Sequence, residues 1–232
     1  MEFKQFVVEE IVQEAADVRT FKLSPLAGNI PKYQPGQFFL LRLPDGTGKF
    51  THRPYSVASH PDEPNLWFCV KNKGFFPSLL WKLKPKDPIE LDGPYGIFLL
   101  GREDKERVFI GGGVGISALR SMILQTVKEN IPSWLFHSAH TKEGLVYFEQ
   151  MKALSLAYPS FCFFPSISGE VTPPGWDGLK GRITVEILKE KLGSLQDKSF
   201  YLCGSKEMVS ALASSLLAAG VPKERIKKDE WG

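Results

Sequence analysis

The chain has 232 residues, of which 43% are hydrophobic and 24% charged, and its net charge is +3. This length suits two small domains, and the weak, dispersed charge argues against nucleic-acid binding. No apolar run reaches the ~18 residues of a membrane span, so we expect a cytoplasmic protein. Three cysteines are too few for an iron–sulfur cluster, and the four histidines show no metal-ligand spacing, so we predict no metal site.

Residues 1–101 show the pattern of short strands. The predicted strands are rich in Phe, Val and Leu and are bounded by turn residues such as Pro35-Gly36. They cover residues 6–12, 18–23, 37–43, 55–58 and 66–71, with one short helix at 78–84. Strands at this spacing predict a small antiparallel barrel.

One predicted strand contains Arg53-Pro54-Tyr55-Ser56. These are the residue types that a bound flavin needs: a guanidinium for its phosphate, an aromatic plane, and a hydroxyl near the reactive ring atoms. Side chains alternate along a strand, so Arg53 and Tyr55 share one face and Ser56 lies on the other. A ligand that touches all three must therefore lie at a strand end or bend. The alternative is that Tyr55 belongs to the core and Arg53 to the surface.

Two glycine turns follow in the same half of the chain. Gly74-Phe75-Phe76-Pro77-Ser78 precedes the predicted helix, and backbone N–H groups in such a turn can bind an anion. In the second turn, Asp92-Gly93-Pro94-Tyr95-Gly96, we interpret the glycines as structural.

Residues 102–232 change to alternating strands and helices after the charged segment 101–107, which is the predicted domain boundary. The strands cover residues 108–110, 134–138, 161–164 and 199–203, and the helices cover 116–129, 147–158, 184–192 and 206–219. This alternation predicts a parallel, doubly wound sheet. Loop 169–181 is rich in Gly and Pro and is long enough to be functional.

A glycine-rich turn joins the first strand and helix of this second half. A turn of this kind places N–H groups against a diphosphate. Its residues are Gly111, Gly112, Gly113, Val114, Gly115 and Ile116. Ser168 and Cys203-Gly204 stand at later strand ends, which is where ligands bind in open α/β sheets.

In this order, Arg53-Pro54-Tyr55-Ser56, the glycine turn, Cys203-Gly204 and the C-terminal Glu230-Trp231-Gly232 resemble the motifs of the ferredoxin–NADP reductase superfamily. The resemblance runs from about residue 35 to residue 231. It implies a Greek-key β-barrel that binds flavin (1–101) and a Rossmann-like α/β domain that binds the nicotinamide dinucleotide (102–232). The implied activity is that of an FAD-dependent NAD(P)H oxidoreductase, which passes hydride to FAD and then electrons to a separate acceptor.

The resemblance also implies site residues. Those expected to hold the cofactors are Arg53, Pro54, Tyr55, Ser56, Gly74, Phe75, Phe76, Ser78, Gly111, Gly112, Gly113, Val114, Gly115, Ile116, Ser168, Cys203, Gly204 and Trp231. Those expected to be catalytic are Ser56, Cys203 and Glu230. Cys203 would lie beside the nicotinamide, Trp231 would cover the flavin ring, and Glu230 would exchange protons with Ser56. The alternatives are a purely structural Cys203 and a surface tail.

Several positions depart from the family pattern. Pro77 stands where relatives carry a hydroxyl, with Ser78 as the nearest substitute, so FMN stays open beside FAD. NADPH-specific relatives place Ser-Arg after the third strand of the second domain, where this chain has Ser168-Gly169-Glu170. A carboxylate there would repel a 2′-phosphate and favours NADH, although Lys180 or Arg182 offers an alternative phosphate site.

The electron acceptor is open at this stage. The choices are ferredoxin, flavodoxin, free flavin, a quinone, another acidic redox protein, or an iron–sulfur centre on a partner subunit. A regulatory or assembly module that binds flavin or nucleotide without turnover is the non-enzymatic alternative. A plain nicotinamide dehydrogenase would leave the first hundred residues unexplained.

Overall fold

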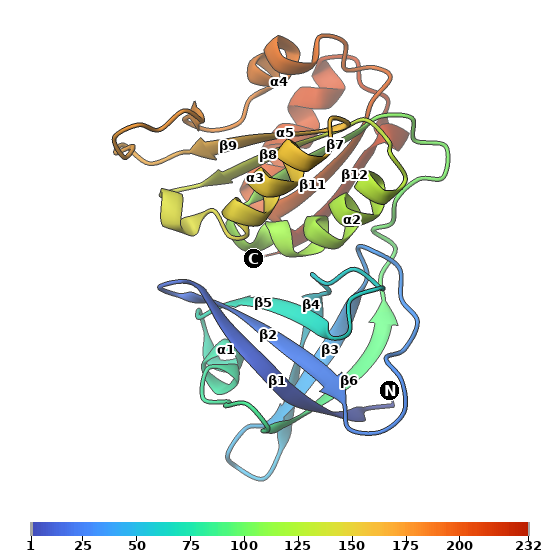
Figure 1. Cartoon of the computed structure of the whole chain (residues 1–232), viewed down its shortest axis with the longest axis vertical. Coiled ribbons are helices and arrows are strands. Elements are labelled where there is room, and N and C mark those ends of the chain that lie inside the picture. The colour runs from blue at the N-terminus through green and yellow to red at the C-terminus, as the bar shows by residue number, and fades with distance from the viewer. Residues whose placement is uncertain (1, 232) are drawn as a thin grey trace.

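The computed structural model describes residues 2–231, with the backbone alone for Trp231. It contains two six-stranded sheets, an antiparallel one in the order β4-β3-β6-β1-β2-β5 and a parallel one in the order β10-β9-β8-β7-β11-β12. The antiparallel sheet lies below and the parallel sheet above in Figure 1, with the C-terminal end of the chain between them. The predicted combination of an antiparallel barrel and a Rossmann-like sheet is confirmed.

The antiparallel sheet curls into a barrel around apolar side chains that alternate inward along its strands. Its elements are β1 (Lys4–Ala15), β2 (Val18–Pro25), β3 (Phe38–Pro44), β4 (Phe50–Ser56), β5 (Leu66–Lys71), α1 (Phe75–Leu80) and β6 (Pro88–Tyr95). Phe21, Phe39 and Phe68 are fully buried in its core. The edge strands β4 and β5 approach each other, and the N–H of Ala58 donates to the carbonyl of Trp67 at 2.8 Å.

The parallel sheet is covered by helices on both faces. Its elements are β7 (Arg107–Gly112), η1 (Gly113–Gly115), α2 (Ile116–Lys128), β8 (Ser133–Ala139), η2 (Lys142–Gly144), α3 (Phe148–Ala157), β9 (Phe161–Ile167), β10 (Leu179–Lys180), α4 (Val185–Leu192), β11 (Ser199–Ser205), α5 (Lys206–Ala218), η3 (Lys223–Arg225) and β12 (Ile226–Trp231). Phe109 packs with α2 and α3, whereas Val108 and Ile110 pack with α4 and α5. The two helical layers therefore follow from alternation along β7.

Some element boundaries differ from those predicted. The helix expected at 78–84 covers Phe75–Leu80, because Gly74 adopts φ +100° and lets the helix begin directly after it. The strand expected at 55–58 is β4, which covers Phe50–Ser56. Its first half is largely polar and is held in the sheet by pairing with β3, from Phe50 opposite Pro44 to Ser56 opposite Phe38.

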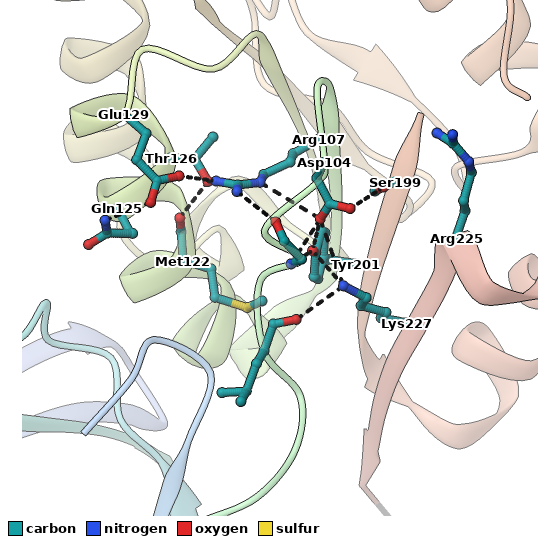
Figure 2. A network of polar contacts seen from close by, with 12 residues as sticks. Asp104, Arg107, Met122, Gln125, Thr126, Glu129, Ser199, Tyr201, Arg225 and Lys227 are labelled. Carbon is teal, nitrogen blue, oxygen red and sulfur yellow. Dashed lines mark hydrogen bonds and ion pairs between the residues drawn. The ribbon is translucent and has the colours of Figure 1, made fainter. Parts of the chain in front are cut away.

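The segment that joins the two sheets is fixed by a buried network around Arg107. Its guanidinium donates to the carbonyl of Gly101 at 3.1 Å and to Glu129 Oε2 at 2.6 Å. The N–H of Gly101 donates to the Tyr201 hydroxyl at 2.8 Å, and that hydroxyl donates to Asp104. Figure 2 shows Arg107 between Glu129 and Asp104, with Tyr201 beside Asp104. The linker that contains the predicted boundary at 101/102 is therefore tied to the start of the parallel sheet.

Candidate active site

Segments far apart in the sequence meet at the junction of the two sheets. Parallel register places Cys203 of β11 opposite Gly111 of β7 on one side and opposite Asp229 of β12 on the other. The carboxyl ends of three neighbouring strands therefore meet at one point, where open α/β sheets bind their ligands. Ser56, at the end of β4, lies near the same point on the barrel side, where hydrogen bonding by its side chain lowers the pKa of Asp229.

The surroundings of the Asp229 carboxyl shift its pKa in opposite directions. Burial raises the pKa of Asp229 above its usual range, and the nearby Glu230 raises it further, while the hydrogen bond from Ser56 opposes both. A carboxyl group with a raised pKa holds a proton more readily than an exposed one does.

The prediction that Glu230 exchanges protons with Ser56 stays a prediction, and the structure adds Asp229 as a second candidate. Glu230 follows Asp229 in β12, and neighbouring strand residues point to opposite faces. Its carboxylate lies 3.6 Å from Lys228 Nζ. The sequence analysis did not single out Asp229, because β12 was not predicted as a strand. Without a strand, the sequence does not show whether Asp229 or Glu230 faces the barrel. The Trp231 side chain lies outside the described part of the chain, and its predicted place over a flavin stays a prediction.

The outer face of β4 offers a cation beside an aromatic ring. Arg53 is exposed, its Nη1 donates to the carbonyl of His52 at 2.8 Å, and it forms no salt bridge with a carboxylate of residues 2–230. Tyr55 is half-buried and stacks on Phe76 with 6.0 Å between ring centroids and 29° between planes. Burial raises the Tyr55 pKa to about 12, so its phenol is neutral. An exposed guanidinium that lacks a protein anion fits a phosphate group.

The turn at α1 differs in detail from the expectation. A side chain at Gly74 would meet open space, and Phe75 is 61% exposed, so a ligand has room beside both. The Ser78 hydroxyl donates to the carbonyl of Phe75 at 2.7 Å within the helix. It therefore satisfies the local backbone, and its predicted substitution for the missing family hydroxyl at Pro77 stays a prediction.

The glycine turn after β7 is packed tightly on one side and open on the other. A Cβ atom at Gly115 would lie 2.4 Å from the carbonyl oxygen of Cys203, so this close contact requires glycine. Gly113 adopts φ +52° and faces open space. His137 of β8 donates from Nε2 to the carbonyl of Gly113 at 3.0 Å, and burial lowers its pKa to about 4. A neutral, buried histidine thus holds the turn in place, a role that the sequence did not reveal.

A cavity of about 850 Å³ opens beside this turn, within the size range of ligand pockets. Gly113, Val114 and Ser168 line it, as predicted for a nucleotide site, and Ser168 also donates to the carbonyl of Ala139 at 3.1 Å. Its charged lining comprises Asp17, Lys71, Glu143, Arg182, Glu186 and Glu207. The carboxylates outnumber the basic side chains. Glu170, which the sequence singled out, does not line this cavity.

Comparisons with known proteins agree with this arrangement. The family model for the oxidoreductase FAD-binding domain matches residues 5–99, and that for the oxidoreductase NAD-binding domain matches residues 109–214. One subunit of the Na(+)-translocating NADH-quinone reductase of Neisseria gonorrhoeae is 31% identical over 200 residues, which cover 78% of this chain and 49% of that relative. The chain therefore spans about half the length of the curated relatives it matches.

Two solved structures resemble almost the entire chain. The FAD/NAD-binding domain of nitric oxide dioxygenase from Vibrio cholerae has a TM-score of 0.87 and 26% identity, over 99% of this chain and 98% of that one. A ferredoxin NADP+ reductase from Neisseria gonorrhoeae with bound FAD and NADP has a TM-score of 0.87 and 25% identity, over 99% of both chains. Within the described residues, no helix combines the length and apolar character needed to cross a bilayer.

Proposed function

We propose that this chain, which belongs to the ferredoxin–NADP reductase superfamily, is an FAD-dependent NAD(P)H oxidoreductase, and that hydride transfer takes place at the junction where Ser56 meets Asp229. This contact between the flavin strand and the last strand of the nucleotide sheet is the observation that carries the proposal. Asp229 lies directly opposite Cys203 in the sheet, and Cys203 in turn lies opposite Gly111 of the glycine turn.

The residues present fit both cofactors. We assign FAD to residues 1–101, with Arg53 at its phosphate and Tyr55, Ser56 and the open turn at Gly74 beside it. We assign the nucleotide to residues 102–232, with the open side of the glycine turn and the cavity around Ser168 as its site. When bound, the flavin supplies the hydride acceptor and can release electrons singly or in pairs.

Within that site the protein positions groups and holds a proton. Ser56 donates a hydrogen bond, and Asp229 accepts it and fixes the orientation of the hydroxyl. Burial raises the pKa of Asp229, so this carboxyl takes up a proton more readily than an exposed aspartate does, and solvent reaches it only partly. Cys203, buried at the end of β11, packs against the glycine turn that would face the nicotinamide.

We propose NADH as the preferred donor. The cavity lining contains four carboxylates, from Asp17, Glu143, Glu186 and Glu207, against two basic side chains. NADPH carries an additional phosphate, and a lining with excess negative charge disfavours it. The preference for NADH thus rests on the charges that line the cavity and no longer on the Glu170 carboxylate. If NADPH were preferred, Arg182 would have to bind its additional phosphate.

We propose a separate protein or a quinone as the electron acceptor. The support is the name of the relatives, which are subunits of an NADH-quinone reductase and of which this chain matches about half. An iron–sulfur partner subunit and a small acidic redox protein are the two forms that a protein acceptor would take. The cytoplasmic location expected from the sequence stays a prediction.

An anaerobic visible spectrum of the purified protein tests the function and the donor together. We expect the bands of an oxidised flavin, bleached by NADH faster and at lower concentration than by NADPH. Bleaching by NADPH alone would reverse the donor assignment. A colourless protein that does not take up added FAD would contradict the proposal, and bound flavin that neither nucleotide reduces would indicate a module without turnover.

A further inference from the structure

Arg120 is a fully buried arginine that extends from one domain into the other. It lies in α2, five residues after Gly115, and its relative exposure is 0%. Its Nη1 donates to the carbonyl of Ala58 at 2.8 Å, and Ala58 lies two residues beyond Ser56. One guanidinium thus connects the helix that follows the glycine turn to the chain that follows the flavin strand.

The same guanidinium is held on every side. It forms a two-pronged pair with Glu63 of the barrel, with Nη1 at 2.7 Å and Nη2 at 2.9 Å from the two carboxylate oxygens. Its Nε donates to Gln150 at 2.8 Å, and its plane lies 4.2 Å from the centroid of the Trp67 ring. Burial alone would raise the pKa of Glu63, but the hydrogen bonds and charge of Arg120 bring it below its usual value, so the pair is ionised at neutral pH.

Two further contacts join α2 to the same loop of the barrel. Gln125 bonds the ring of His60 at 2.8 Å, and Lys128 pairs with Asp62. The loop that carries these partners is itself folded around Glu63, whose carboxylate accepts the N–H of His60 at 2.6 Å. The helix therefore lies along the loop after β4, with the buried arginine at the end closest to the glycine turn.

We propose that Arg120 is a positioning residue, which sets the separation between the flavin strand and the nicotinamide turn through its contacts with Glu63 and Ala58. A buried, bidentate ion pair tolerates little displacement, because movement leaves a charge without its partner in a medium that solvates it poorly. Hydride transfer in turn requires the reacting atoms at about 3–3.5 Å. The expected effect of Arg120 on the rate of flavin reduction rests on the proposed function. Its expected effect on the relative position of the two domains does not.

The test compares two buried arginines. Arg120→Met removes the contacts that this guanidinium makes with the barrel, and Arg120→Lys keeps a charge without the two-pronged geometry. Arg107→Met is the matched control, because Arg107 is also buried and paired with carboxylates, yet its partners all lie between residues 101 and 129. Glu63→Gln neutralises the partner and serves in place of Arg120→Met if that variant does not fold.

Two measurements are made on each variant: the limiting rate of flavin reduction in anaerobic stopped flow, and X-ray scattering of the apoprotein. For Arg120→Met we expect a limiting rate lower on the order of 10–100-fold, with flavin content and half-saturating nucleotide concentration unchanged, and a larger maximum dimension of the apoprotein. Arg120→Lys should have a limiting rate and a maximum dimension between those of Arg120→Met and the wild type. Arg107→Met should lose thermal stability, and it should change the rate and the scattering curve much less than Arg120→Met does, because the contacts of Arg107 hold the linker and none reaches the loop after β4.

The inference is overturned if folded Arg120→Met matches the wild type in rate and scattering, or if Arg107→Met lowers the rate equally. If neither NADH nor NADPH reduces the wild-type protein, the proposed function fails. The scattering of the apoproteins then decides the inference alone: an expanded Arg120→Met supports the role of Arg120 in domain orientation, and an unchanged one refutes it.

Discussion

Asp229 serves the proposed reaction at some expense in stability, because the position that brings it to Ser56 also buries its carboxylate. Its pKa in the folded protein is raised above the value of 3.8 that applies to the unfolded chain. The folded state therefore binds more protons between these two pKa values, and stability falls as the pH rises through that window. Proteins commonly tolerate such a penalty at a functional site.

Replacing this carboxyl should separate its effects on stability and on catalysis. We expect Asp229→Asn to raise Tm of the apoprotein at pH 7 by up to a few degrees, because asparagine cannot ionise. The difference from the wild type should disappear below pH 3.8, where aspartate is protonated in both states. The limiting rate of flavin reduction should fall on the order of 10²-fold. Thermal melts across pH and stopped-flow reduction measure the two effects.

Glu230→Gln is the comparison for this variant, since Glu230 is the neighbouring carboxylate and pairs with Lys228 instead. It should lower the rate much less than Asp229→Asn. An equal or greater loss in Glu230→Gln would contradict the assignment made from the geometry and restore the one made from the sequence.

At the scale of elements, the sequence predicted those helices and strands whose apolar residues follow a regular period. The units β7–α2 and β11–α5 could be predicted because a buried strand, a glycine and an amphipathic helix follow one another. β4, β6 and β12 carry polar, proline or charged residues and exist because neighbouring strands hold them in register. Periodicity cannot detect elements of this kind, and β12 carries the site residue that the sequence analysis missed.

Shortening β12 tests whether this strand acts through Asp229 alone. A chain ending at Lys228 should still fold, because β11 stays paired with β7 and β12 is an edge strand. We expect it to bind FAD and to be reduced as slowly as Asp229→Asn. A chain ending at Glu230 keeps the Ser56 contact, so any change in its nucleotide affinity is due to the loss of the last two residues. If both shortened chains are reduced as fast as the full-length protein, the C-terminal tail has no role in the reaction.

At the scale of the whole molecule, the site belongs to neither sheet by itself. Ser56 comes from the barrel, while Gly111, Cys203 and Asp229 come from three strands of the parallel sheet. The two parts also share buried polar contacts away from the site, such as the 2.8 Å bond between the hydroxyls of Thr20 and Tyr147. These contacts persist only while both halves are folded. A ligand that stabilises one half should therefore also stabilise the other half against unfolding.

This coupling predicts one unfolding transition rather than two. FAD at about 100 times its Kd should stabilise the folded chain by about 2.7 kcal/mol and raise a single Tm by roughly 5–10 °C. Differential scanning calorimetry of the apoprotein with FAD, and with FMN as the control, measures this shift. An equal shift with FMN would show that the adenosine half of FAD contributes little. Two separate transitions, with FAD moving only one of them, would contradict the coupling and show that the barrel unfolds independently of the nucleotide domain.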